Sequence, residues 1–243
     1  MEPLHKRIVI KLSGEFLQET TQDTFSPQAV DRVVRVLSLL IENKIELGIV
    51  IGAGNLFRGK ESSSLMLDRV VGDQIGMLGT IMNALVVCNA LRAIGIRAHV
   101  MAPNPSVSSV LPYDAVQAKQ LIQKGEPVFI AGGTGNPFFT TDSAATLRAL
   151  ELDATVLVKS TKVKGVFSSD PVKDKGATRF EEISFEEVLK RRLEVMDHTA
   201  IAMAMQYGLP IFIYKFGDPM SVLEAMNSAD SGTYVFSKQS SNE

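Results

Sequence analysis

The chain has 243 residues, of which 45% are hydrophobic and 21% are charged, and its formal net charge is -2 at pH 7. This composition is typical of a globular chain that buries a sizeable core. The small net charge gives no electrostatic reason to expect nucleic acid or a membrane surface as a partner, although a few local cations can still bind a compact anion. The one cysteine, Cys88, excludes an intrachain disulfide. No run reaches about 18 uninterrupted apolar residues, so we expect a cytoplasmic protein.

Short β-type runs alternate with helical patterns along the chain. Strands are predicted at residues 7–12, 47–51, 97–101, 127–131, 155–158, 210–214 and 233–236. Helices are predicted at residues 30–41, 65–93, 114–123, 142–150, 185–192, 199–207 and 219–226, with a loop or hairpin at 162–171. This alternation predicts an α/β fold: a mostly parallel central sheet with helices on both faces, in three αβα layers. We expect one domain over residues 1–243, with two soft lobes at 1–152 and 153–243.

Two glycine-containing segments follow the first two predicted strands. The first strand ends in Lys11-Leu12-Ser13-Gly14, where glycine lets backbone N–H groups approach a phosphate and lysine adds a point charge. Alone, such an ending is most often only a turn. The second strand leads into residues 52–59, which include Arg58, a side chain that can form a forked contact with phosphate oxygens. The glycine spacing matches neither a P-loop nor a dinucleotide-binding fingerprint, which disfavours both classes.

A longer glycine-rich loop, residues 132–142, joins a predicted strand to a predicted helix. Thr140 or Thr141 is a candidate helix cap, and the N-terminus of that helix would offer backbone donors to an anion. A long capped loop that only connects elements is the plainer interpretation. Loops of this composition at strand ends more often bind a ligand, so we favour a ligand-binding role over a purely connecting one.

Lys159 ends another predicted strand and is therefore expected to face the same crevice as Lys11. A lone lysine is usually a solvated surface side chain. The prediction of a binding site therefore depends on the set of four loops, which converge on one edge of one sheet. Asp197 is ambiguous by itself and could cap the helix that follows. The isolated histidines, and the lack of Cys/His or paired-carboxylate spacing, predict no metal site of the protein's own.

Together these segments resemble the bacterial UMP kinases (uridylate kinases), a branch of the amino acid kinase family. The similarity spans residues 7–236, and its most specific mark is the run Gly-Thr-Gly-Asn-Pro-Phe-Phe-Thr-Thr-Asp at 133–142. Further marks are residues 11–15, residues 54–59, Asp73 with Gly76-Met77, and Val195-Met196-Asp197. The resemblance implies an amino acid kinase-like fold and a phosphotransferase that moves the γ-phosphoryl group of ATP onto UMP, giving UDP, in pyrimidine nucleotide synthesis.

The resemblance also implies which residues form the site. Lys11 and Lys159 match lysines near the transferred phosphoryl group, and Asp142 and Asp197 match aspartates that orient such lysines. The positions that match the ATP site are Lys11, Leu12, Ser13, Gly14, Gly54, Arg58, Thr161, Phe167 and Asp170. The positions that match the UMP site are Ala53, Asp73, Thr134, Gly135, Asn136, Pro137, Phe138, Phe139, Thr140 and Thr141, with Asp73 on the ribose hydroxyls.

Members of this family are homohexamers assembled from dimers, need Mg²⁺, are inhibited by UTP and are often regulated by GTP. The resemblance therefore implies Mg²⁺ carried with ATP, a homohexamer and allosteric control. Three features depart from the family pattern. Ala53 stands where the family usually has glycine, and Lys164 stands where it usually has aspartate. Residues 18–27 lack the glycines that many relatives carry there, which bears on GTP regulation.

The implied acceptor, a phosphate monoester, has a second pKa of about 6 and is mostly dianionic at neutral pH, so no general base is required. Positioning and electrostatic stabilisation of the moving phosphoryl group remain as the catalytic tasks. Two other interpretations stay open. One is a relative that phosphorylates carbamate or an amino-acid carboxylate, against which Asp73 and residues 133–142 argue. The other is a non-catalytic nucleotide-binding or storage protein on the same fold, against which Lys11 and Lys159 argue.

Overall fold

A computed structural model describes residues 5–57, 65–193, 195–217, 222–223 and 231–237 of the chain. The strands are β1 (Arg7–Leu12), β2 (Glu46–Ile51), β3 (His99–Ala102), β4 (Leu111–Pro112), β5 (Val128–Ile130), β6 (Val156–Thr161), β7 (Glu182–Ser184), β8 (Ile211–Lys215) and β9 (Gly232–Phe236). The helices are η1 (Gly14–Leu17), α1 (Pro27–Glu42), α3 (Arg69–Ala93), α4 (Ala115–Gln123), α5 (Thr141–Glu151), α6 (Phe185–Lys190) and α7 (His198–Gln206).

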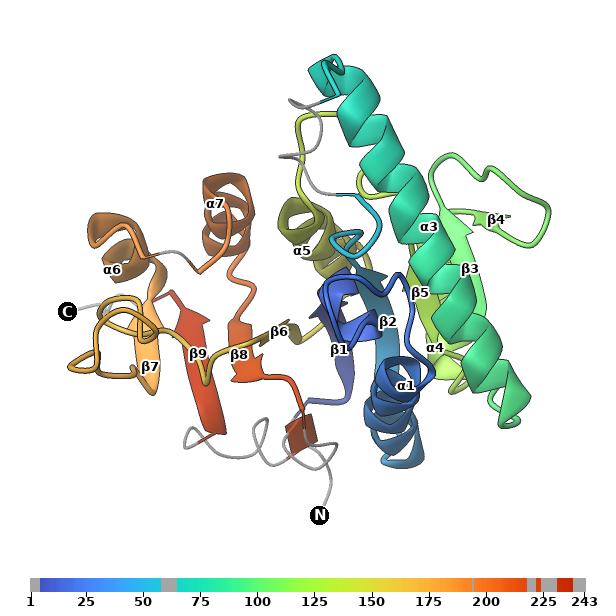
Figure 1. Ribbon diagram of the computed structural model, residues 1–243. Helices are drawn as coiled ribbons and strands as arrows, with labels where there is room; N and C mark the ends of the chain where they lie inside the picture. Colours follow the sequence, from blue (N-terminus) through green and yellow to red (C-terminus); the bar gives the residue numbers. More distant parts are fainter. Residues whose placement is uncertain (1–4, 58–64, 194, 218–221, 224–230, 238–243) are drawn as a thin grey trace.

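Within the described residues the strands form one sheet in the order β4-β3-β5-β2-β1-β6-β8-β9-β7. Neighbouring strands run parallel except for β8 and β9, which are antiparallel. β1 lies between β2 and β6, and the three strands end at the same edge of the sheet (Figure 1). The strand order and directions therefore confirm the predicted mostly parallel sheet.

The two faces of the sheet bury separate apolar clusters, because successive side chains of a strand point to opposite faces. Ile8 and Ile10 of β1 pack with residues of α1 and α3 on one face. Val9 belongs to the cluster on the other face, with residues of α4, α5, α6 and α7. The helices thus cover both faces (Figure 1), and the predicted three-layer αβα architecture is confirmed.

Helix α3 begins later than its apolar pattern predicts. We expected a start at residue 65, but Asp68 caps the helix, accepting a hydrogen bond from the Val70 N–H at 2.8 Å. Aspartate favours this cap position because its carboxylate satisfies a backbone donor that has no partner within the helix.

Helix α3 is, by length and hydropathy alone, long and apolar enough to cross a membrane. The helix packs along the sheet beside α1, and its buried apolar residues Ile81, Ala84, Val87, Cys88 and Leu91 belong to the core.

The short elements were not predicted. The three residues of β7 and the two residues of β4 are too few to show a period in the sequence. β6 runs on to Thr161, three residues beyond the predicted end. The segment predicted as a loop or hairpin is irregular, and Phe167 forms an isolated antiparallel bridge with Arg179. Most of the helix predicted at residues 219–226 lies outside the described residues.

Candidate active site

Lys11 and Lys159 lie side by side at the centre of the sheet and share one carboxylate. They are register partners in the parallel ladder of β1 and β6, so their side chains point to the same face. Asp142, in the first turn of α5, covers that face. Its two oxygens lie 2.9 Å from the Lys11 Nζ and 2.6 Å from the Lys159 Nζ. The prediction that the two lysines face one crevice, made from their positions at strand ends, agrees with this register.

The surroundings of Asp142 perturb the ionisation of this group. Burial raises the pKa of the Asp142 carboxyl, but the Lys11 and Lys159 ammonium groups outweigh burial and leave that pKa below its usual range. Burial lowers the pKa of Lys159, and the Asp142 carboxylate opposes that effect only in part. The ion pairs group two lysine side chains around one carboxylate in a site with little access to water, where positive charge attracts an arriving phosphate more strongly than in bulk solvent.

Asp197 reaches this cluster indirectly. Its carboxylate caps α7 by accepting a hydrogen bond from the Ala200 N–H at 3.0 Å, as its position in the sequence suggested. The same carboxylate accepts a hydrogen bond from the Thr140 hydroxyl and another from the Ser143 hydroxyl at 2.9 Å. Thr140 in turn caps α5, which carries Asp142. Asp197 thus ties α7 to the helix that carries Asp142.

The turn before Asp197 also contacts the lysine pair. The Val195 carbonyl accepts a hydrogen bond from the Lys159 Nζ at 2.6 Å. Asp142 and this carbonyl together fix the Lys159 ammonium from two directions. A cavity of about 480 Å³ opens beside them and is lined by Asp142, Lys159, Arg192, Leu193, Val195, Met196, Asp197 and His198.

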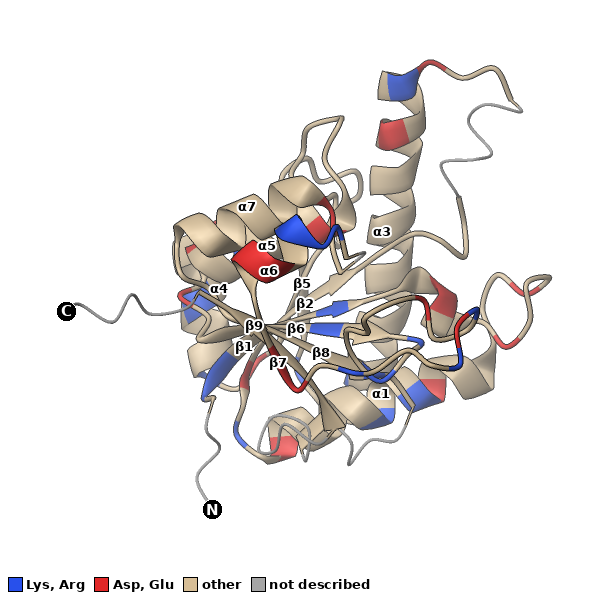
Figure 2. Cartoon of the chain, turned by 90° about the vertical axis from the view of Figure 1, so that its left-hand side faces the viewer, with Lys and Arg blue, Asp and Glu red and all other residues tan. Residues whose placement is uncertain are grey.

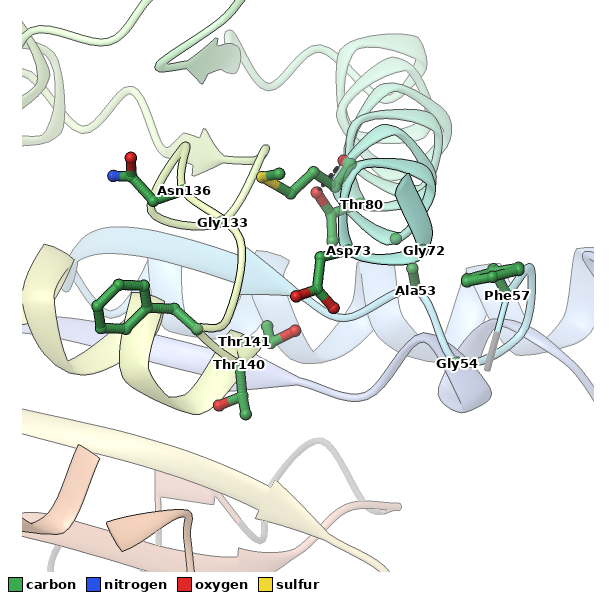
Figure 3. Close-up of a pocket in the computed structure, with 13 residues that line it drawn as sticks. Ala53, Gly54, Phe57, Gly72, Asp73, Thr80, Gly133, Asn136, Thr140 and Thr141 are labelled. Atoms are coloured by element: carbon green, nitrogen blue, oxygen red, sulfur yellow. Dashed lines mark hydrogen bonds between the residues drawn. The ribbon is translucent and has the colours of Figure 1, made fainter. Parts of the chain in front are cut away.

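A second cavity, of about 390 Å³, lies between α3, the loop after β2 and the loop before α5. Figure 3 shows Asp73 pointing from α3 into the space between that helix and the loop that carries Gly133, Thr140 and Thr141. The Asp73 carboxylate accepts a hydrogen bond from the Phe138 N–H at 2.7 Å and one from the Arg69 Nε at 2.8 Å. An acidic group at the wall of a cavity of this size can accept hydrogen bonds from hydroxyls of a ligand.

The cavity contains most, but not all, of the residues assigned to UMP. It is lined by Ala53, Asp73, Asn136, Phe139, Thr140 and Thr141 from that set, together with Gly54, Phe57, Gly72, Gly76, Met77, Thr80 and Gly133. Thr134, Gly135, Pro137 and Phe138 do not line it. The Thr134 hydroxyl instead bonds the backbone of Asn136 within the loop.

Sequence reasoning assigned no role to Phe57, Gly72 and Thr80. The helical residues of the cavity, at 72, 73, 76, 77 and 80, recur at a spacing of three or four and therefore share one face of α3. That spacing was available in the sequence once Asp73 had been singled out. The position of Phe57 follows from the course of the loop, which no local pattern indicates.

The loop over residues 132–141 takes a backbone course that its composition permits. Gly132, Gly133 and Gly135 have φ values of 74°, 60° and 84°, which glycine adopts without the steric cost of a side chain. Phe138 also has a positive φ, 70°, which is unusual for an aromatic residue. Its N–H bonds Asp73 and its ring lies under the Arg69 guanidinium, 5.5 Å from the ring centre. Backbone strain of this kind is characteristic of binding loops.

Two of the residues assigned to ATP, Leu12 and Thr161, lie at the ends of the strands that carry the lysine pair. Ser13 caps η1, and the Leu12 side chain is buried in the core, so Leu12 can offer a ligand only its backbone. Thr161 ends β6, and its hydroxyl donates to the Val163 carbonyl at 2.6 Å. Arg58 lies outside the described residues.

Phe167 lines a cavity of about 290 Å³ with Lys162, Val163, Lys164, Pro171, Val172 and Lys215. Three lysines and an aromatic ring in one cavity suit a ligand with a planar base and anionic groups. Asp170 does not line this cavity; its carboxylate bonds the Val172 N–H at 2.9 Å. Lys162 also forms an ion pair with Glu15 at 2.5 Å. Figure 2 shows basic and acidic residues interspersed over the described elements, so the clustering of lysines at this cavity is local.

Among the described residues, no three His, Cys, Asp or Glu side chains group as metal ligands. Both oxygens of Asp142 contact lysines, and both oxygens of Asp197 accept hydrogen bonds from hydroxyls. Mg²⁺ in kinase sites is held through one or two carboxylates and the substrate phosphates. The donor set therefore fits an ion that arrives with a phosphate ligand better than an ion held by the protein alone.

Comparisons with known proteins agree with this geometry. The profile described as "Amino acid kinase family" matches residues 6–215. The uridylate kinase of Ectopseudomonas mendocina (strain ymp) is 43% identical over 234 residues, which cover 96% of this chain and 95% of that protein. The uridylate kinase of Legionella pneumophila (strain Corby) is 42% identical over 231 residues, or 95% of this chain and 94% of that protein.

Solved structures give the same result. The UMP kinase from Bacillus anthracis superposes with a TM-score of 0.93 at 32% identity, covering 97% of each chain. The UMP kinase from Ureaplasma parvum superposes with a TM-score of 0.88 at 30% identity, covering 96% of this chain and 99% of that one. The chain belongs to the amino acid kinase family.

Proposed function

We propose that this protein is a nucleoside monophosphate kinase that transfers the γ-phosphoryl group of ATP to UMP, giving UDP and ADP. The observation that carries the proposal is the Lys11–Asp142–Lys159 cluster. Asp142 directly follows Thr140 and Thr141 of the cavity that contains Asp73, and Lys159 lies on β6, whose end leads into the lysine-rich cavity that contains Phe167. The relatives at 42–43% identity, named uridylate kinases, support UMP as the acceptor.

The chemistry needs no base from the protein. The UMP phosphate is already mostly dianionic near pH 7, since its second pKa is about 6. The main obstacle is repulsion between the acceptor phosphate and the triphosphate of ATP. Lys11 and Lys159 would offset this repulsion and stabilise the charge on the moving group. Mg²⁺, carried on the phosphates of ATP, would neutralise further negative charge.

Asp142 would act as a positioning residue for the two lysines. Two ammonium groups on neighbouring strands repel one another, and a carboxylate that contacts both offsets the repulsion and fixes their geometry. Asp197 would hold α5 in register through Thr140 and Ser143. Neither carboxylate is required to move a proton.

The binding roles follow the two soft lobes of the chain. In the lobe at 1–152, Asp73 would bind the ribose hydroxyls of UMP, and the loop at 134–141 would enclose the nucleotide. In the lobe at 153–243, Thr161, Phe167 and Asp170 would bind ATP, whose phosphates would lie over residues 11–14, Gly54 and Arg58. These assignments rest on the family resemblance, and the cavities support those of Asp73 and Phe167; Asp170 does not line the cavity of Phe167, and Gly54 lines the cavity that contains Asp73.

The resemblance also leads us to propose a homohexamer in the cytoplasm that serves pyrimidine nucleotide synthesis and is inhibited by UTP. Light scattering coupled to gel filtration tests the assembly, and a UTP titration of the initial rate tests the inhibition. A monomer, or a rate that does not change with UTP, would remove the corresponding part of the proposal.

A panel of acceptors tests the substrate directly. Initial rates of ADP release are measured with Mg-ATP and UMP, CMP, AMP, deoxy-UMP or carbamate. We expect UMP to give the highest kcat/KM. Equal or better turnover of CMP, AMP or carbamate would contradict the assignment. No turnover above background with any acceptor would indicate the non-catalytic nucleotide-binding alternative.

A further inference from the structure

Asn83 is a fully buried amide on the sheet-facing side of α3. Its exposed fraction is 0%, and it lies among Ala84, Val87 and Cys88, which belong to the apolar core. A buried amide is unfavourable unless its donors and acceptor are hydrogen-bonded. The bonds that Asn83 makes therefore show what this polar group does in an otherwise apolar helix face.

Those bonds join α3 to the loop after β2. The Asn83 Nδ2 donates to the Gly52 carbonyl at 2.7 Å and to the Asn55 Oδ1 at 2.8 Å. The Asn55 Nδ2 donates to the Asn83 Oδ1 at 3.1 Å and to the Thr24 carbonyl at 2.9 Å. The two amides thus pair reciprocally, and each also holds one backbone carbonyl. We call these two side chains the amide pair.

The amide pair lies directly against the loop after β1. A Cβ placed on Gly14 would lie 2.3 Å from the Asn55 Oδ1, 2.4 Å from the Gly52 oxygen and 2.8 Å from the Asn83 Nδ2. Gly14 therefore packs its backbone on the pair without room for a side chain. The Gly52 N–H also donates to the Leu12 carbonyl at 2.9 Å. The segments after β1 and β2 are consequently held against one another through one connected group of polar atoms, centred on the buried Asn83 amide.

The loop after β2 meets both substrates in the proposed function. Ala53 lines the cavity that contains Asp73, whereas Gly54 and Arg58 are assigned, with residues 11–14, to the phosphates of ATP. We propose that the amide pair of Asn83 and Asn55 is a positioning device that sets the spacing between residues 11–14, on the ATP side, and Ala53, on the UMP side. This inference deepens the proposed phosphoryl transfer and rests on it.

A positioning role makes a prediction that a purely structural role does not. The residues assigned to each nucleotide would still be able to contact it if the pair were lost, so binding of either nucleotide alone would change little. Transfer between the two requires both loops at one separation, and misplacement on the ångström scale can lower the rate by about 100-fold. The diagnostic signature is therefore a fall in kcat without a matching change in either dissociation constant.

The experiment compares Asn55→Ala, Asn83→Ala and the double variant with the wild type. Asn55 is only half-buried, so Asn55→Ala tests the role even if Asn83→Ala does not fold. Asn43→Ala is the matched control, since its Nδ2 donates to the Leu39 carbonyl at 2.8 Å at the far end of α1. For each protein, kcat for UDP formation is measured, and ATP and UMP are titrated separately by calorimetry.

We expect kcat to fall about tenfold or more in each amide-pair variant. The double variant should lose little more than the worse single variant, because the two side chains act together. Each dissociation constant should change less than about threefold, and Asn43→Ala should retain the wild-type kcat. Near-normal kcat in a folded Asn55→Ala variant would overturn the inference. So would a dissociation constant for ATP or UMP that rises in proportion to the fall in kcat. Absence of UDP formation by the wild type would instead contradict the proposed function itself.

Discussion

Lys11 and Lys159 are separated by 148 positions in the chain, yet they are direct register partners in neighbouring parallel strands and contact opposite oxygens of Asp142. Side chains at matched positions of parallel strands point to the same face, so the register alone brings the two ammonium groups together. The first turn of α5 supplies the carboxylate that lets both charges remain close. This arrangement is the structural basis for assigning phosphoryl transfer to the centre of the sheet.

The Asp142 carboxylate should contribute stability that disappears in acid. Its pKa is lowered in the fold from the ordinary value of 3.8, so the contribution is present above that value and is lost as pH falls through the folded-state pKa. At pH 7, Asp142→Asn should lower the free energy of unfolding by about 3 kcal/mol, because it leaves two neighbouring cations without their anion.

Urea unfolding of wild type and Asp142→Asn at neutral pH and at progressively lower pH measures this dependence. The difference in the free energy of unfolding between the two proteins should shrink as wild-type Asp142 becomes protonated. Asp31→Asn serves as control, because Asp31 pairs with Arg35 on the surface and such pairs contribute under about 1 kcal/mol. A gap that stays constant down to the acid transition would contradict the role given to Asp142.

Asp73→Asn should weaken the binding of UMP by about tenfold and the binding of ATP much less. The reason is that a hydrogen bond to a charged group is worth more than one to a neutral amide. Separate titrations of the two nucleotides measure the difference. Arg69→Gln is the matched control: it removes a partner of Asp73 while leaving the carboxylate in place. If ATP affinity fell most in Asp73→Asn, the two nucleotide sites would be exchanged in our assignment.

Ala53, which replaces a glycine usual in the family, is accommodated by the absence of a side chain at Gly79. A Cβ on Gly79 would lie 2.8 Å from the Ala53 Cβ, too close for two methyl groups. Gly79→Ala should therefore destabilise the protein by about 1–3 kcal/mol and raise the KM for UMP, since Ala53 lines the cavity.

Adding Ala53→Gly to Gly79→Ala should restore stability, because only one methyl group then occupies the contact. Unfolding free energies of the wild type, both single variants and the double variant form the required cycle. Gly76→Ala controls for the helix preference of alanine, since a Cβ there would meet nothing within 4 Å. Additivity within about 0.5 kcal/mol would show that the two positions are independent.

Lys164 lies in the cavity that contains Phe167, Lys162 and Lys215, where it adds to the positive charge of the site that we propose for the triphosphate of ATP. Lys164→Asp should raise the KM for ATP about threefold at low salt, an effect under 1 kcal/mol as expected for an exposed group. The difference should shrink as salt rises, because the screening length falls to about 8 Å near physiological ionic strength. kcat should stay nearly constant.

Steady-state kinetics at two ionic strengths measure the effect of Lys164. Lys175→Asp makes the same charge change in the same segment, at an exposed residue that does not line the cavity. An ATP KM that Lys164→Asp leaves unchanged at both salt concentrations would make Lys164 a surface substitution without a role in binding.

The sequence predicted the parts of the fold that repeat a pattern over many residues. The strand at residues 7–12 and the adjacent helix were found because alternation and helical spacing persist there, whereas β7 is too short to show either. The Lys11 and Lys159 crevice was predicted because strand ends in a parallel sheet share one edge.

Contacts between distant segments could not be predicted in this way. The cap formed by Asp197 has a local signature, but its bonds to Thr140 and Ser143 depend on how α5 meets α7. Asn83 sits in an apolar helical pattern, and nothing local distinguishes it from a core residue that happens to be polar. Its partners at Gly52 and Asn55 are about thirty positions away and become visible only once the sheet is folded.

The most direct measurement of the central claim is the turnover number for UDP formation from Mg-ATP and UMP by the wild type, Lys11→Ala and Lys119→Ala. Lys119 is a matched control because its ammonium also pairs with a carboxylate, that of Asp153 at 2.6 Å, away from the cavities. The wild type should form UDP, and Lys119→Ala should match it. Lys11→Ala should lose about 100-fold or more in kcat, since removing one preorganised charge costs roughly 3 kcal/mol at the transition state. A folded Lys11→Ala protein with near-normal kcat would contradict the account.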